Sequence, residues 1–205
     1  MMICINVLQK KTEAVDLLLG NNCLVGKDEN EFTPLHSACI YGREKTVEIL
    51  LKHAVDINGK GKNGITPLYL ACHNGDVETV QLLLSNRANV NERTDDNRTP
   101  LHEACHRGNV ACLKTLLESN ANIEAVDLQG NTGLMIAILS NSVGCVSLLI
   151  ENKADVFIKN NIGSFILFLI SILFTFHPFS SISLTKSNHF PVLVQPHHPS
   201  MILNL

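Results

Sequence analysis

The chain has 205 residues, of which 45% are hydrophobic, so it is long and apolar enough to bury a core. Its formal net charge of −3 and its lack of Trp argue against a nucleic-acid partner, because neither phosphate neutralisation nor base stacking has an obvious basis.

The seven cysteines do not indicate a disulfide framework, because most of them recur at one interval. Cys39, Cys72 and Cys105 are 33 residues apart, and so are Cys112 and Cys145. Recurrence of this kind is typical of small apolar residues in a reducing compartment. The first residues also lack the order of charge and apolar length that a secretory signal has. We therefore expect a cytoplasmic protein, with the nucleus as an alternative compartment.

A 33-residue repeat organises the chain. Thr33, Thr66, Thr99 and Thr132 follow one another at this spacing, and the first three each begin a Thr-Pro-Leu triplet. A fixed period of this length predicts a stack of units, each of which buries its apolar side against its neighbours. We expect a partial or capping unit at 1–27, which is also how a chain that begins inside a longer array would look. The complete units are 28–60, 61–93, 94–126 and 127–159.

Each complete unit predicts two short helices and a projecting loop. The Thr can cap the first helix, and the Pro fits its first position, where a missing N–H group has no effect. Gly42, Gly75, Gly108 and Asn141 then end that helix, because these residue types tolerate a left-handed backbone. The second helix has apolar residues at i, i+3 and i+4, and a connector rich in Asn, Asp and Gly follows it. The fold class is therefore an all-α solenoid.

The residues from 28 to 159 resemble ankyrin repeats, with their turn, Thr-Pro-Leu-His motif, Gly and apolar helix. The resemblance implies that the motif His ties neighbouring connectors together by hydrogen bonds. Tyr69 and Met135 depart from this pattern because they replace the His. Gly133 replaces the Pro, so we expect the fourth unit to be the least stable of the complete units.

The resemblance also implies a non-enzymatic scaffold or adaptor, a monomer without cofactor, that binds a partner protein through its concave face and hairpin tips. Exposed aromatic residues are favoured as anchors of such interfaces, although packing within the chain would explain them equally well. The partner-binding candidates are those that the pattern places on the tips and first helices: Phe32, Ile40, Tyr41, Lys62, Asn63, Ile65, His73, Asn74, Asp95, Asp96, Arg98, His106, Arg107 and Gln129.

One stretch, 102–106, has the His-Glu-x-x-His pattern of zinc hydrolases, in which two histidines on one helix bind the metal and the Glu is the general base. The predicted helix is only about two turns long, and no third ligand follows at a usual spacing. His102 is moreover the motif His of its unit. We therefore expect no metal and no enzyme activity, and keep a zinc hydrolase as a remote alternative.

Asn91 is a candidate for modification. Ankyrin repeats are frequent targets of an asparaginyl hydroxylase that favours a Leu eight residues before the Asn of a Val-Asn pair. Leu83 and Val90-Asn91 match that spacing.

The segment 161–205 begins a degenerate repeat and then changes composition, since Lys186 is its only Lys, Arg, Asp or Glu. Its stretch 162–184 could tether the scaffold to a membrane, which is our alternative function. The densest apolar run, 165–176, would cover only about 18 Å of a ~30 Å hydrocarbon core as a helix. A buried helix of a degenerate repeat and an unevolved tail remain the other two interpretations.

Overall fold

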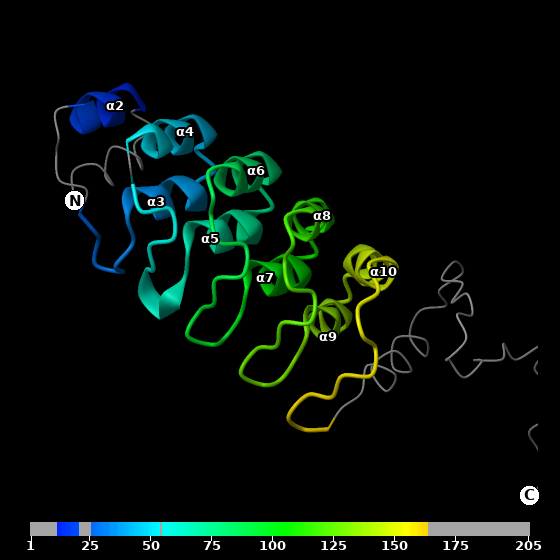
Figure 1. Ribbon diagram of the computed structural model, residues 1–205. Coiled ribbons are helices and arrows are strands. Elements are labelled where there is room, and N and C mark those ends of the chain that lie inside the picture. Colours follow the sequence, from blue (N-terminus) through cyan, green and yellow to red (C-terminus); the bar gives the residue numbers. More distant parts are fainter. Residues whose placement is uncertain (1–11, 21–25, 54, 164–205) are drawn as a thin grey trace, which may run out of the picture.

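The computed structural model describes residues 12–20, 26–53 and 55–163, and these residues form an all-α repeat (Figure 1). Its helices are α2 (Thr12–Gly20), α3 (Pro34–Ile40), α4 (Glu44–Lys52), α5 (Pro67–Asn74), α6 (Val77–Ser85), α7 (Pro100–Arg107), α8 (Val110–Glu118), α9 (Gly133–Leu139) and α10 (Val143–Glu151). A 3-10 turn, η1, spans Lys62–Gly64. The described residues contain no β-strand, only an isolated antiparallel bridge between Val126 and Thr132.

The helices lie in two layers (Figure 1). An inner layer stacks α3, α5, α7 and α9 in chain order, and an outer layer stacks α2, α4, α6, α8 and α10. Each expected unit contributes one helix to each layer, and α2 extends the outer layer at the N-terminal end. The prediction of an all-α solenoid is confirmed.

The inner helices begin as the sequence predicts. Thr66 and Thr132 have extended backbones and accept a hydrogen bond from the amide three residues later, at 3.3 and 3.4 Å. These contacts satisfy one of the amide groups that a helix start leaves without a partner. The helices then end at left-handed residues, since φ is +75° at Gly75, +70° at Gly108 and +54° at Asn141.

The core runs along the stack because equivalent positions are buried in successive units. Leu35, Leu68, Leu101 and Leu134 are each at most 1% exposed, and Cys39, Cys72 and Cys105 are fully buried. A short amphipathic helix pair cannot exclude water from both sides alone, so each unit depends on its neighbours for burial.

The connectors form a parallel set of loops that project from the inner layer (Figure 1). Each loop is closed by the same backbone hydrogen bond, for example Thr94 N to Arg98 O at 2.9 Å. Neighbouring loops are joined as well, because Asp95 N donates to Asn63 O at 3.0 Å and Leu128 N to Asp96 O at 3.0 Å. This ladder sets the relative positions of the loop tips.

None of the helices among the described residues is long and apolar enough to cross a bilayer. The proposed membrane segment, 162–184, lies outside the described residues from 164 onward. The structure therefore provides no support for the membrane-tethered alternative.

Candidate partner-binding surface

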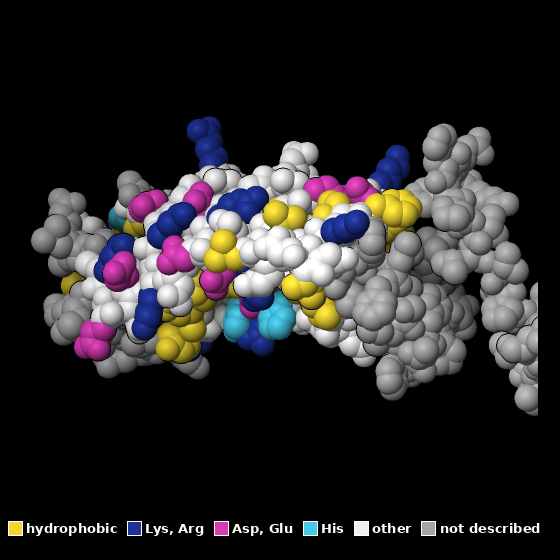
Figure 2. All heavy atoms as spheres, turned by 90° about the horizontal axis from the view of Figure 1, so that it is seen from below, with side chains coloured by type: hydrophobic (Ala, Val, Ile, Leu, Met, Phe, Trp, Pro, Cys, Tyr) yellow, Lys and Arg dark blue, Asp and Glu magenta, His cyan; other side chains and the backbone are white. Residues whose placement is uncertain are grey.

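The inner helices expose one continuous row of side chains at their C-terminal ends. Equivalent positions along the stack contribute one pair of residues per unit, and we call these pairs the inner-helix row: Ile40 and Tyr41, His73 and Asn74, His106 and Arg107, Leu139 and Ser140. Figure 2 shows histidine and Lys or Arg side chains gathered between hydrophobic patches on this side of the molecule. The row is therefore polar at its centre and apolar at its ends.

A buried carboxylate lies beneath the centre of the row. The Glu103 side chain is 5% exposed, and its Oε2 accepts a hydrogen bond from the Tyr69 hydroxyl at 2.7 Å. Burial, together with this bond to the carboxylate, raises the pKa of Tyr69, so its hydroxyl stays protonated and remains a donor. The bond joins α5 to α7 at a unit whose motif His is replaced by Tyr69.

The other oxygen of Glu103 orients two side chains of the row. Its Oε1 lies 2.6 Å from His73 Nδ1 and forms an ion pair with the Arg107 guanidinium, whose Nε lies 3.3 Å away. Arg107 also contacts the His73 ring through Nε and a terminal nitrogen. A buried carboxylate is tolerated only when such partners compensate for lost hydration. Here the Tyr69 hydroxyl, the His73 ring and the Arg107 cation do so.

The motif histidines His36 and His102 are fully buried, and each is hydrogen-bonded to the next unit. The Thr99 N–H donates to His102 Nδ1 at 3.0 Å, which leaves Nε2–H to donate to Asn131 O at 3.3 Å in the next unit. His36 repeats the arrangement, with its Nε2 3.0 Å from Ile65 O. Burial lowers the pKa of both imidazoles, so the neutral form is favoured. The hydrogen bonds between neighbouring connectors that the resemblance implied for the motif His are present at His36 and His102.

The His-Glu-x-x-His pattern is not assembled as a metal site. Both ring nitrogens of His102 are used by the chain, Glu103 is held by its own donors, and His106 Nδ1 lies 3.2 Å from Ser140 Oγ. Within the described ranges, no group of three or more His, Cys, Asp or Glu residues could hold a metal ion.

Some partner-binding candidates have contacts inside the chain. Asn74 Nδ2 donates to the carbonyls of Cys39 and Ile40 at 2.8 and 2.6 Å and so caps α3. Phe32 stacks on His36 with ring centroids 5.2 Å apart. Arg98 is half-buried, with its Nε 3.9 Å from the buried Asp127 carboxylate.

The remaining candidates fall into two exposure groups. Ile65 and Ile40 are half-buried, while Tyr41 is 48% exposed. The others at the loop tips and on α7 are exposed: Lys62, Asn63, Asp95, Asp96, Gln129, His106 and Arg107. Their role in binding stays a prediction.

Asn91, the modification candidate, is exposed, but its side chain forms hydrogen bonds with the next unit. Its Oδ1 accepts the Asn122 N–H of the next unit at 2.7 Å, and its Nδ2 lies 3.5 Å from Asn120 O. The Asn91 amide thus joins its connector to that of the next unit. Modification at Asn91 stays a prediction.

Sequence reasoning missed the role of Glu103, which it considered only as a zinc-site base. A signal was available, because the equivalent positions in the other units are Ser37, Leu70 and Ile136. A charge at a position that is otherwise small or apolar indicates a compensating partner, and Tyr69, 34 residues earlier, is that partner.

Comparison with protein families gives a clear match. A family model described as ankyrin repeats in three copies matches residues 1–94 and 86–160. No curated protein matches the chain.

Proposed function

Because the chain belongs to the ankyrin-repeat family, we propose that it is a non-enzymatic adaptor or scaffold that binds one partner protein through the inner-helix row and the loop tips. Ankyrin repeats are generally protein–protein interaction modules. We propose a monomeric, cytoplasmic protein that needs no cofactor.

The observation that carries this proposal is the exposed row itself. Tyr41 is 48% exposed and Leu139 is 63% exposed, although they lie at the C-terminal ends of the inner helices α3 and α9, most of whose other apolar side chains are buried. Rigid aromatic and aliphatic side chains of this kind act as anchors when a partner covers them. A repeat stack offers them along an extended surface rather than in a pocket.

Affinity capture tests the proposal. The full chain, a 1–160 fragment and a Tyr41→Ala variant are each used as bait, with Leu17→Ala as control because Leu17 is exposed on the outer helix α2. We expect the full chain and the 1–160 fragment to retain the same partner, and Tyr41→Ala to lose it with an unchanged melting temperature. Equal capture by Tyr41→Ala, or capture that needs residues after 160, would contradict the proposal.

A further inference from the structure

We propose that the inner-helix row recognises an extended acidic segment of the partner, with apolar side chains on either side of the acidic residues. This inference rests on the proposed function and adds the chemistry of the partner to it.

Hydrogen-bond donors at the centre of the row support an acidic occupant. Among the inner helices α3, α5, α7 and α9, Glu103 is the sole Asp or Glu, and its side chain is only 5% exposed. Arg107 is 41% exposed, and its Nε and one terminal nitrogen face the ring nitrogens of His73. Its other terminal nitrogen and the exposed His106 present donors without an exposed acidic neighbour on these helices. A partner carboxylate finds donors here.

Glu103 acts as a positioning residue in this arrangement. Its Oε2 is used by Tyr69, which alone would join α5 to α7. The separate Oε1 holds His73 and Arg107, at 2.6 and 3.3 Å. Two long side chains that are already oriented lose less conformational entropy when a partner binds.

Apolar side chains lie at both ends of the row. Tyr41 is 48% exposed at the end of α3, and Leu139 is 63% exposed at the end of α9. They are three units apart from first to last, with the polar residues of α5 and the donor groups of α7 between them. The pattern along the stack is apolar, polar, donor, apolar, because the His73 nitrogens face Glu103 and Arg107.

The spacing of the helices converts this pattern into a peptide motif. Packed helices are about 8–10 Å apart, and an extended chain advances about 3.3 Å per residue, so each unit corresponds to about three peptide residues. The matching segment has apolar residues about nine positions apart, with an acidic residue about six positions after the first. An acidic cluster without those flanking residues fits less well.

A library of random peptides displayed on phage tests the inference against the full chain. We expect selected peptides to carry one or two acidic residues between apolar residues about nine positions apart. Synthetic copies should bind Arg107→Gln at least about tenfold more weakly, and should lose affinity when their acidic residues become Asn or Gln. Arg107 contacts the buried Glu103, so His106→Gln is the second variant. His106 Nδ1 lies 3.2 Å from Ser140 Oγ, a surface hydroxyl.

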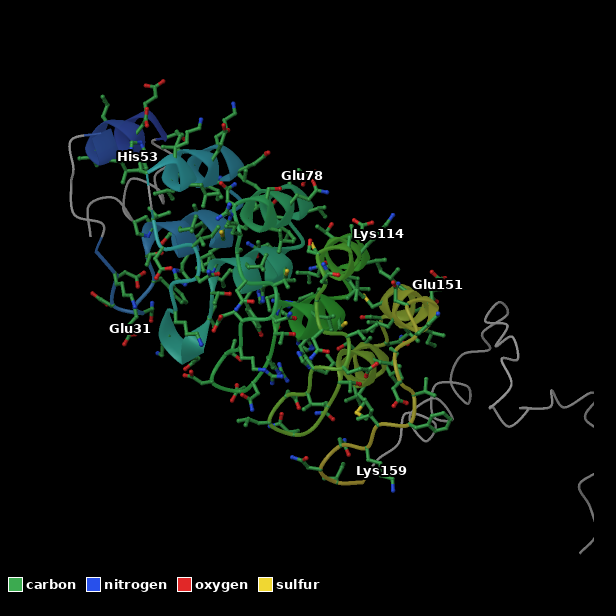
Figure 3. All side chains as sticks on the ribbon, in the orientation of Figure 1. Glu31, His53, Glu78, Lys114, Glu151 and Lys159 are labelled. Atoms are coloured by element: carbon green, nitrogen blue, oxygen red, sulfur yellow. The ribbon has the colours of Figure 1, made fainter. Side chains whose placement is uncertain are left out.

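Lys114→Gln is the matched control, because it removes a cation from the outer helix α8. Figure 3 shows Lys114 on that layer, pointing away from the inner helices. Melting temperatures of all three variants separate lost binding from lost folding.

Selected peptides that lack acidic residues, or that bind the Arg107 and His106 variants as well as the unchanged chain, would overturn the inference while leaving the proposed function standing. Binding that requires phosphoserine in place of the acidic residues would overturn it too, in favour of a phosphopeptide. A selection that enriches no peptide also counts against it. If affinity capture fails as well, the proposed function fails.

Discussion

At the scale of single residues, Glu124 is poorly matched to its site. Asn58 and Asn91 occupy the equivalent positions, and the Oδ1 of each accepts an amide of the next unit, at 2.8 and 2.7 Å. Glu124 Oε1 makes the same contact with Asp155 N at 2.7 Å. Its Oε2, however, is buried without a hydrogen-bond partner. An unpaired buried carboxylate oxygen destabilises the folded state.

Glu124→Asn should therefore stabilise the protein by about 1 kcal/mol, because it keeps the acceptor for Asp155 and removes the unpaired oxygen. Urea unfolding measures this, and we expect the midpoint of the Glu124→Asn variant at a higher urea concentration. Glu124→Ala is the comparison, since it removes the acceptor as well and should fall below Glu124→Asn. Equal stability of the Asn variant and the unchanged chain would show that the buried oxygen has no cost.

The buried histidines predict a dependence of stability on pH. Burial lowers the pKa of His36 and His102 in the folded state, whereas in the unfolded chain they titrate near the ordinary histidine pKa of about 6.5. Between the lowered and the ordinary pKa, the unfolded chain binds more protons. The contribution of these histidines to the free energy of unfolding is therefore fully present above about pH 6.5 and is lost progressively as the pH drops below it.

Urea midpoints at pH 7.5 and 5.5 measure this loss. The difference should shrink in the double variant His36→Gln, His102→Gln, because Gln does not titrate. The pKa of Glu92 is lowered chiefly by its hydrogen bond with Lys60, so its contribution to stability is lost only at more acidic pH, below the ordinary glutamate pKa of about 4.5. An unchanged pH dependence in the double variant would rule out these two histidines as its source.

At the scale of the elements, basic side chains join successive connectors. Lys27 Nζ donates to Lys60 O at 2.9 Å, Lys60 Nζ to Arg93 O at 3.0 Å, and Arg93 Nη1 to Val126 O at 2.9 Å. Each basic residue thus bonds the backbone of its own equivalent in the next unit. The series stops at Val126, because a valine side chain has no hydrogen-bond donor.

Arg93→Met should destabilise the stack by about 1 kcal/mol, because it keeps most of the aliphatic length but removes the bond to Val126 O. Thermal unfolding is the measurement, and Lys45→Met, an exposed cation on α4, is the control. If both variants melt alike, the contact between connectors contributes nothing beyond the loss of a surface charge.

At the scale of the whole molecule, burial in the stack protects the thiols. Cys39, Cys72, Cys105, Cys112 and Cys145 are all fully buried. Burial raises the pKa of Cys112 to about 11 and that of Cys72 well above its ordinary value. Thiol reagents attack the thiolate, so the raised pKa slows the reaction of these two cysteines and the lack of access slows the reaction of all five. A hydrogen bond with Cys105 lowers the pKa of Cys145, so Cys145 is protected by its burial alone.

We expect these five cysteines to resist an alkylating reagent in native buffer and to react together in denaturant. Mass spectrometry of digested protein assigns the labelled positions. Labelling of one of the five at the rate of a free thiol in native buffer would show that its unit opens independently of the stack.

Much of the fold followed from the sequence because its causes are local and repeat. A Thr before a Pro starts a helix, a Gly or Asn with a left-handed backbone ends it, and the apolar spacing selects the buried side. The choice of Ile40, His73 and His106 also followed from the 33-residue period, since equivalent positions lie on one surface of a regular stack, whereas Leu139 at the same position of the fourth unit was not among the candidates.

The tertiary structure decided which of those residues are free to bind a partner. Asn74 caps a neighbouring helix, and Glu103 is held by Tyr69, His73 and Arg107. Neither set of contacts could be read from a single unit. Gly133 is another residue whose contacts could not be read from the sequence of its own unit. The sequence indicates only a missing Pro ring, but a Cβ atom there would lie 2.3 Å from a Leu101 methyl group. The sequence sets each unit's backbone through short-range hydrogen bonds and sterics, whereas side-chain contacts depend on what the neighbouring unit places opposite, about 30 residues away in the chain.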